Sequence, residues 1–167
     1  NHDLNFDADH DHHSDETFER VFGPSYYSFD YGPTHFVVLD DVVWQGAKTQ
    51  PDNRGRYKAG LGKAQLDWLA KDLANVPSNQ LVVLMMHIPI TENEDKAELF
   101  QLIAERPYAL SVSAHTHFQE HRFLTKQDGW PKAEPHHHVV NVTTCGSWWT
   151  GAPDARGVPH TTMRDGA

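Results

Sequence analysis

The strongest constraint on the fold is a repeated order of segments, in which an apolar, strand-like run follows an amphipathic helix. The run "NQLVVLMMHIP" (79–89) follows a helix-like segment at 62–76, and "YALSVSAHTH" (108–117) follows a second one at 95–105. Leucines three and four residues apart give the first of these helices one apolar face. Strands that alternate with helices are typical of layered α/β domains. We therefore predict an α/β fold, and 167 residues are enough for a single domain with its own core.

Further strands are expected on both sides of this central part. The segment "SYYSFDYGPTHFVVLDD" (25–41) reads as two strands joined by a tight turn, and "HFVVLD" (35–40) is apolar enough to be buried on both faces. "EHRFL" (120–124) and "HHHVVNVTTCGSWW" (136–149) read as two more strands. Near the beginning, Ser14 is the expected N-cap of a short helix, "DETFERVF".

Three segments are expected to be loops around this single domain. Residues 1–13 form an acidic stretch rich in His and Asp, residues 45–62 are polar and rich in glycine, and residues 152–167 lack any periodic apolar pattern.

Charge and cysteine content limit the classes of ligand. The formal net charge of −9 argues against binding of a nucleic-acid backbone, which needs clustered Lys and Arg, but it is compatible with bound cations. The single cysteine, Cys145, excludes an intrachain disulfide and a thiolate zinc cluster, so any metal site has to use His, Asp or Asn. No apolar run reaches the length of a membrane-spanning helix.

Two groups among the 13 histidines fall at predicted strand ends. His115 and His117 follow one buried strand, and two residues apart in extended backbone both imidazoles can leave on the same side. His87 follows the other strand, and Pro89 prevents that strand from continuing. A lone histidine at such a position is usually structural. Two strand-end groups favour a shared crevice, because ligands of α/β sheets gather beyond the carboxyl ends of the strands.

The other histidines carry weaker signals. His136, His137 and His138 are interpreted as residues of a surface or crevice rim, with a substrate contact as the minor alternative. His10, His12 and His13, which stand among aspartates, are expected to be solvated and to hold divalent ions loosely. His35, His121 and His160 have no context that singles them out.

Three short segments, "NHD" (1–3), "MMHIP" (85–89) and "SAHTH" (113–117), resemble in this order the later motifs of the calcineurin-like metallophosphoesterases. That family's pattern runs Asp-x-His, Gly-Asp-x-x-Asp, Gly-Asn-His-Asp/Glu, a lone strand-end His and Gly-His-x-His. The segments "GPSYYSFDYGPTHFVVLDD" and "CGSWWTG" are similar to a bacterial branch that is usually exported. On this resemblance the chain corresponds to the later part of the catalytic domain, a layered α/β/β/α sandwich without its first strands, which leaves a sheet edge open for self-association.

The resemblance also implies a chemistry, the hydrolysis of small phosphomonoesters or phosphodiesters by metal-activated hydroxide. Asn1, His87 and His115 would ligate one divalent ion (Zn, Mn or Fe), and His117 would ligate a second. His2 would be the general acid for the leaving group, and Asp3 would orient its imidazole. Imidazole and amide oxygen are suitable ligands for borderline divalent ions, and two such ions can brace an in-line attack on phosphorus.

Departures from the family pattern leave an alternative open. Ala114 stands where the family has glycine, which costs little unless the backbone needs positive φ. Asp-x-His and Gly-Asp-x-x-Asp, which supply the bridging carboxylate, are missing from the chain, and Asp40, Asp41 or the acidic loop are the available substitutes. The alternative function is therefore a metal-binding fragment with one ion and little or no catalysis.

Trp148 and Trp149 would lie near the crevice on the same resemblance, as substrate contacts or, alternatively, as a core residue and a surface platform.

Overall fold

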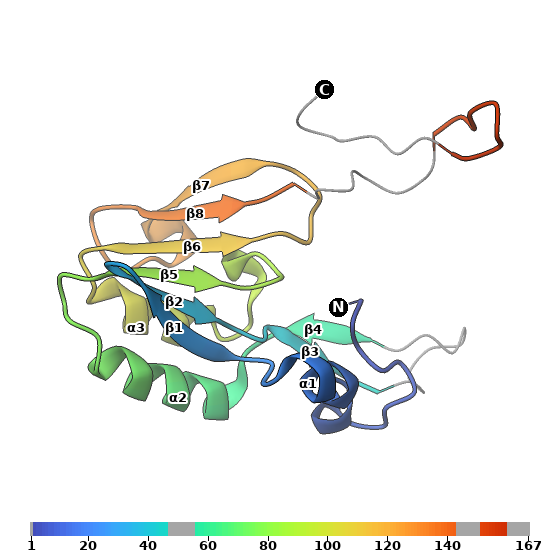
Figure 1. The fold of residues 1–167 in the computed structure, drawn as a ribbon. Helices are drawn as coiled ribbons and strands as arrows, with labels where there is room; N and C mark the ends of the chain where they lie inside the picture. Colours follow the sequence, from blue (N-terminus) through green and yellow to red (C-terminus); the bar gives the residue numbers. More distant parts are fainter. Residues whose placement is uncertain (1, 47–55, 143–150, 160–167) are drawn as a thin grey trace.

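A six-stranded mixed sheet forms the centre of the protein (Figure 1). The computed structural model describes residues 2–46, 56–142 and 151–159. In spatial order the strands are β1 (Tyr27–Tyr31), β2 (Thr34–Val38), β5 (Leu81–Met85), β6 (Ala109–Ser113), β8 (His136–Val140) and β7 (Glu120–Leu124). The four inner strands run parallel, and the edge strands β1 and β7 are antiparallel to their neighbours. The predicted α/β fold is confirmed, and it is compatible with a metallophosphoesterase-type sandwich.

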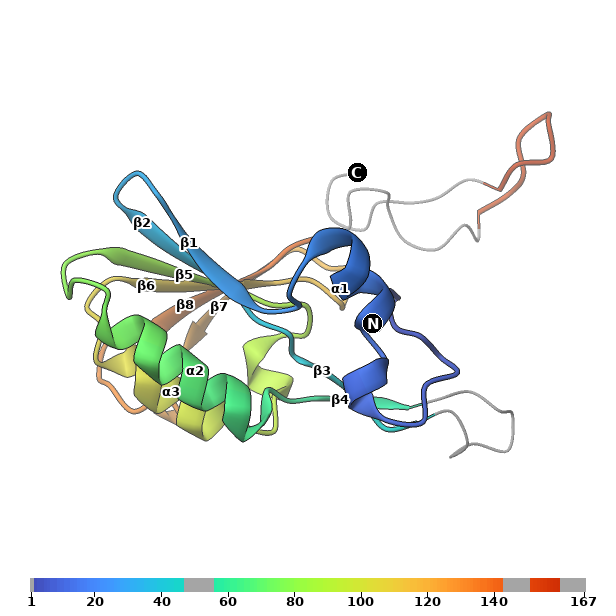
Figure 2. The same cartoon turned by 60° about the horizontal axis from the view of Figure 1, so that its bottom comes forward.

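Two helices, α2 (Gly62–Ala74) and α3 (Lys96–Ala104), cover one face of this sheet (Figure 2). Both were expected from their apolar spacing. Leu69 of α2 and Ile103 of α3 are fully buried, and so is Leu84 of β5. The main core therefore lies between the helices and the sheet. Among the described residues, no helix is long and apolar enough to cross a membrane.

The opposite face of the sheet is only partly covered by the described residues. Phe29 on β1 and Phe123 on β7 are 44% and 59% exposed, although both are large apolar side chains. The register places one row of side chains across all six strands on this face: Phe29, Phe36, Val83, Leu110, His137 and Phe123. The predicted pair of strands β1 and β2 is thus confirmed. The expectation that β2 is buried on both faces is wrong, because its side chains alternate between buried and partly exposed. Self-association at the edge of this sheet stays a prediction.

A two-stranded sheet, β3 (Val42–Trp44) with β4 (Tyr57–Ala59), lies beside the main sheet. Strand β4 falls within the segment 45–62 that was predicted to be a loop, so that prediction is wrong for 57–59. The pairing partner of β4 and the hydrogen bond from Glu94 N to Ala59 O both come from distant parts of the chain. A three-residue strand of this kind has no periodicity that a local pattern could reveal.

The short helix α1 (Glu16–Phe22) begins one residue later than expected, with Asp15 rather than Ser14 at the N-cap. The hydroxyl of Ser14 instead donates to the carbonyl of Asp11, in the 3₁₀ turn Asp11–His13. The buried Ser14 side chain therefore closes the preceding turn. Two further 3₁₀ turns are Ile90–Glu92 and Lys126–Asp128.

Strand β8 contains the three consecutive histidines, and their interpretation as rim residues is wrong for two of them. His136 and His138 are 4% and 0% exposed and point into the core. The hydroxyl of Ser111 lies 2.8 Å from His136 Nε2 and 2.7 Å from His138 Nδ1, and Ser113 Oγ lies 2.9 Å from His138 Nε2. These two histidines are therefore part of a buried polar network between β6 and β8.

The carboxyl ends of the parallel strands all face one end of the molecule. The N-terminal segment, α1 and the β3–β4 pair lie at that end as well (Figures 1 and 2). This arrangement brings the residues after β5 and β6 together with the residues that follow β2 and with the beginning of the described chain.

Candidate metal and active site

His87 and His115 meet at the carboxyl ends of two neighbouring strands. Strands β5 and β6 are parallel partners, and each histidine lies two residues beyond the end of its strand. His87 Nε2 lies 3.0 Å from His115 Nδ1, and the ring planes are nearly perpendicular. The fold therefore brings together the two strand-end groups that the sequence singled out.

The pKa of each imidazole is lowered, which favours its neutral form. Burial, assisted by the charges of neighbouring groups that include His115, His2 and His117, lowers the pKa of His87 to about 4. Burial also lowers the pKa of His115, although Glu92 acts in the opposite direction. Neutral imidazole is the form that binds metal ions, so at neutral pH no proton has to be removed from either ring.

The segment that carries His115 and His117 has an unusual backbone. Both residues have positive φ, 65° and 61°, and they are the only described non-glycine residues that do. The expectation of extended backbone between these two histidines is therefore wrong. Left-handed conformations cost a non-glycine residue roughly 1 kcal/mol or more, and they are often kept where the site needs a particular side-chain direction. Ala114 does not share this conformation, so its substitution for glycine imposes no positive-φ strain.

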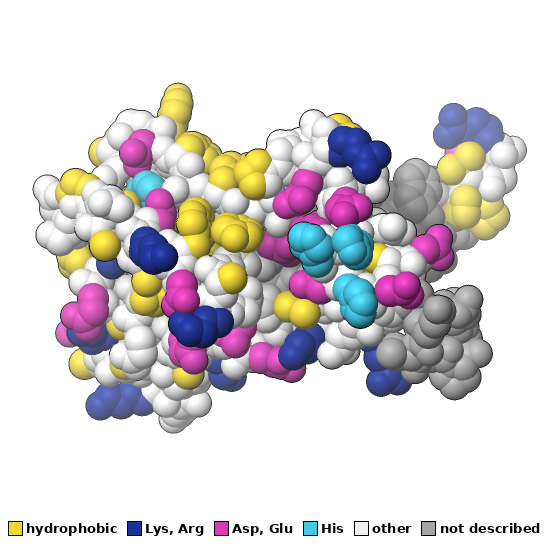
Figure 3. Space-filling view, turned by 90° about the horizontal axis from the view of Figure 1, so that it is seen from below, with side chains coloured by type: hydrophobic (Ala, Val, Ile, Leu, Met, Phe, Trp, Pro, Cys, Tyr) yellow, Lys and Arg dark blue, Asp and Glu magenta, His cyan; other side chains and the backbone are white. Residues whose placement is uncertain are grey.

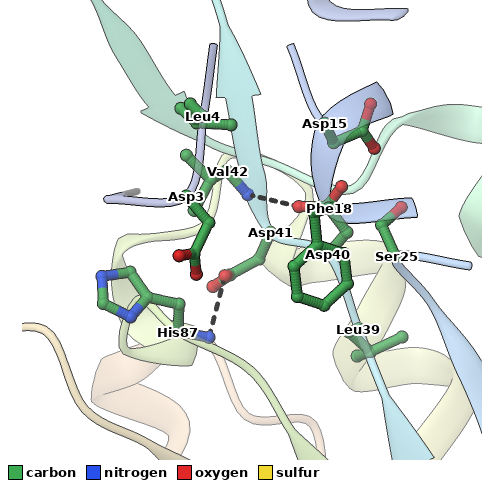
Figure 4. Close-up of a pocket in the computed structure, with 10 residues that line it drawn as sticks. All are labelled: Asp3, Leu4, Asp15, Phe18, Ser25, Leu39, Asp40, Asp41, Val42 and His87. Carbon is green, nitrogen blue, oxygen red and sulfur yellow. Dashed lines mark hydrogen bonds between the residues drawn. The ribbon is translucent and has the colours of Figure 1, made fainter. Parts of the chain in front are cut away.

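A pocket of about 130 Å³ opens beside His87 (Figure 4). Its wall includes Asp3, Asp40 and Asp41, with Phe18 of α1 on one side. In Figure 4 the carboxylates of Asp3 and Asp41 point toward one another near the His87 imidazole. Asp3 thus comes from the beginning of the chain to the same place that the strand ends reach.

The two carboxylates that follow β2 are both shielded from water. Burial raises the pKa of Asp41 to about 7 and that of Asp40 to about 6, even though hydrogen bonds from backbone N–H groups act against the shift. Asp41 accepts hydrogen bonds from the backbone of His87 and Ile88. The sequence had marked Asp41 only as a substitute ligand, and its contact with the His87 turn was missed because it links residues 46 positions apart.

Some of the other predicted site residues belong to the described part of the chain, and some do not. His2 is exposed, and both His2 and His117 influence the pKa of His87, so they lie close enough to act on it electrostatically. Asn1, Trp148 and Trp149 lie outside the described residues, and so does Cys145.

The pair of strand-end histidines fits part of a metal shell. Two imidazole nitrogens bound to one tetrahedral zinc ion, each at 2.0–2.1 Å, are about 3.3 Å apart. The 3.0 Å between His87 Nε2 and His115 Nδ1 differs from this by a few tenths of an ångström. Within the ranges that the structure describes, no group of three or more His, Cys, Asp or Glu is arranged to hold a metal ion. The described part therefore brings together two imidazoles at a separation close to that of two ligands of one ion.

The histidines of the acidic N-terminal segment are separate from this pair. His10, His12 and His13 are exposed, and His13 Nδ1 is 2.7 Å from Glu16. Figure 3 shows histidines gathered among acidic side chains near the end of the molecule that carries α1. The expectation that these residues are solvated is confirmed, whereas loose ion binding by them stays a prediction.

Comparison with known proteins supports the class suggested by the motifs. A family model described as the C-terminal part of calcineurin-like phosphoesterase matches residues 136–167. The match covers less than half of the chain, and it lies beyond His87, His115 and His117, although it includes the segment "CGSWWTG". The match suggests the phosphoesterase family, whose members are hydrolases that generally depend on divalent metals. A search of curated proteins found no significant match.

Proposed function

We propose that this protein hydrolyses small phosphomonoesters or phosphodiesters with the help of divalent metal ions bound at the carboxyl ends of β5 and β6. The observation that carries the proposal is the 3.0 Å approach of His87 Nε2 and His115 Nδ1. The order of the motifs and the family match at 136–167 are in agreement with it.

In this proposal His87 and His115 would hold one ion together with the side-chain oxygen of Asn1, and His117 would contribute to a second. Zinc, manganese and iron all suit such nitrogen and oxygen ligands. A divalent ion at this place would supply the positive charge that polarises a phosphoryl oxygen and makes a water molecule nucleophilic.

The remaining residues would act on the substrate itself. His2 would donate a proton to the leaving oxygen, since imidazole can do so near neutral pH. Asp3 would keep that imidazole in position, from the pocket wall that it shares with His87. Trp148 and Trp149 are proposed as contacts to the organic part of the ester.

A second candidate function is metal binding without useful turnover. It is favoured by the finding that the described residues assemble two histidine ligands and no larger group. One ion held by few ligands would polarise a phosphate ester, but it could not brace both the attacking and the leaving oxygen.

Hydrolysis of p-nitrophenyl phosphate and bis(p-nitrophenyl) phosphate, measured with and without added zinc or manganese, separates these functions. The phosphoesterase proposal expects metal-dependent turnover that His87→Ala abolishes and that His121→Ala leaves intact. His121 is the matched control, because it also contacts a second histidine, His137, at 2.8 Å but lies on the partly covered sheet face. Metal binding without turnover would support the second candidate, and turnover that survives His87→Ala would overturn the first.

A further inference from the structure

Asp41 is a buried carboxylate whose position links three parts of the site. It lies between β2 and β3 and is only 1% exposed. Its own carbonyl accepts a hydrogen bond from Gly60 N, which ties this stretch to the end of β4. A backbone hydrogen bond therefore holds Asp41 in place independently of its side chain.

The side chain of Asp41 binds the turn that carries His87. Oδ1 accepts from His87 N at 2.9 Å and from Ile88 N at 3.2 Å, and Oδ2 accepts from Ile88 N at 2.9 Å. Figure 4 shows the carboxylate directed at the His87 backbone, with the imidazole on the pocket side. Two adjacent backbone N–H groups of the turn are thus satisfied by one buried side chain, so this contact is a firm anchor.

The anchored turn continues into the segment that carries the second histidine. The carbonyl of His87 accepts a hydrogen bond from Ala114 N, and His115 follows directly. One carboxylate thus fixes the backbone of His87, which in turn fixes the backbone next to His115. The two imidazole nitrogens meet at the end of this series of contacts.

The neighbouring carboxylate makes a useful contrast. Asp40 is also shielded from water and lines the same pocket, but its Oδ1 accepts from Val42 N, at the start of β3. The hydrogen bonds to the His87 turn all come from Asp41, so a substitution at Asp40 changes the same charge in the same pocket without removing any of them.

We propose that Asp41 is a positioning residue, which holds the turn His87–Ile88 so that His87 Nε2 and His115 Nδ1 face a common point. This role differs from that of a substitute metal ligand, because both carboxylate oxygens are directed at backbone N–H groups. That this position favours metal binding rests on the proposed function. That Asp41 holds the turn can be tested in the metal-free protein.

The test compares Asp41→Asn with Asp40→Asn in the 167-residue chain. In the Asp41→Asn variant one side-chain oxygen remains, and the new NH₂ group faces an N–H donor. Each variant is titrated with zinc by calorimetry, its free energy of unfolding is measured, and the imidazole signals of the metal-free protein are recorded by ¹H–¹⁵N NMR. The buried His138 in β8 serves as an internal reference for intact folding.

We expect the zinc affinity of the folded Asp41→Asn protein to fall roughly 10- to 100-fold, as is usual when the partner that orients a ligand is lost. The His87 and His115 signals should shift while those of His138 stay, and Asp40→Asn should leave all of them near wild type. A purely structural role would lower the stability of Asp41→Asn and leave its zinc affinity and His87 signals unchanged, and that result would overturn the proposal. Equal effects of the two substitutions would also overturn it.

The role of Asp41 can be tested even if the proposed function fails or the variant does not fold. If the wild-type chain binds no zinc, the proposed function fails, but the NMR comparison still decides the role of Asp41. If Asp41→Asn does not fold, amide hydrogen exchange in the wild type takes its place. The amides of His87 and Ile88 should then be protected although neither residue lies in a strand, and rapid exchange of both would contradict the anchor.

Discussion

His87 and His138 have the same lowered pKa, about 4, yet their surroundings give the two rings opposite roles. His138 is fully buried, and both of its ring nitrogens contact serine hydroxyls. His87 is only partly buried and lies on the wall of a pocket, and its Nε2 faces another imidazole. Burial explains both pKa values, so a shifted pKa does not by itself identify a functional histidine. What distinguishes the two residues is the partner of the ring: serine hydroxyls in the core for His138, and a second strand-end imidazole beside a pocket for His87.

The largest expected effect is the loss of stability when the buried histidine of this comparison, His138, is replaced. Replacing His138 with alanine removes a fully buried ring and leaves the hydroxyls of Ser111 and Ser113 without that partner, so the free energy of unfolding should fall by roughly 3 kcal/mol. Urea denaturation measures this. His137→Ala is the matched control, because His137 lies on the partly covered face, and it should cost less than about 1 kcal/mol. Similar losses in both variants would contradict the account of β8.

The pH dependence of stability sharpens the same comparison. Burial keeps His138 neutral in the folded state, with a pKa of about 4 against an ordinary 6.5. Between these two pH values the unfolded chain binds more protons than the folded protein. The contribution of His138 to the free energy of unfolding is therefore complete above pH 6.5 and is lost as the pH falls toward 4. Between pH 6.5 and pH 4 the free energy of unfolding of the wild type should therefore fall by on the order of 2 kcal/mol more than that of His138→Gln.

The pH profile of the wild type has to be compared with that of His138→Gln, because Asp40 and Asp41 change the stability of both proteins with pH in the direction opposite to His138. Their raised pKa values favour the protonated folded state, so the stability from these groups is present at low pH and lost as the pH rises through about 6 and 7. Parallel pH profiles of the wild type and His138→Gln would show that His138 is not held neutral by the fold.

A smaller effect tests the strained backbone at the site. Since His117 has a φ of 61°, His117→Gly should be more stable than His117→Ala by about 1 kcal/mol, because glycine adopts this conformation freely. Ala114 provides the reverse control: it does not have positive φ, so Ala114→Gly should cost roughly 0.5–1 kcal/mol. Thermal unfolding of the three variants measures the expected gain in stability from glycine at 117 and the expected loss from glycine at 114. If glycine at 117 is less stable than alanine, the left-handed backbone is not a source of strain.

The sequence predicted those parts of the molecule whose signals are local. Apolar periodicity located α2, α3, β5 and β6, and the position of His87 directly after an apolar run placed it at a strand end. The pairing of His87 with His115 follows because neighbouring parallel strands end on the same side of a sheet.

The parts that were missed depend on contacts between distant segments. The burial of His136 and His138 requires serines from another strand, and Trp130 packs against His136 with ring centroids 4.8 Å apart. A run of three histidines shows nothing of these partners, and its polarity suggests the surface. The contact of Asp41 with His87 and the pairing of β4 with β3 were missed for the same reason.

We propose that His87 and His115 bind a metal ion more tightly than any other histidine pair among the described residues. Calorimetric titration of the 167-residue chain with zinc tests it most directly, with His87→Ala, His115→Ala and His121→Ala as variants. The account predicts that the tightest zinc site of the wild type weakens at least about 100-fold in the first two variants and stays in the third. A tight site that persists without His87 and His115, or that disappears with His121, would contradict it.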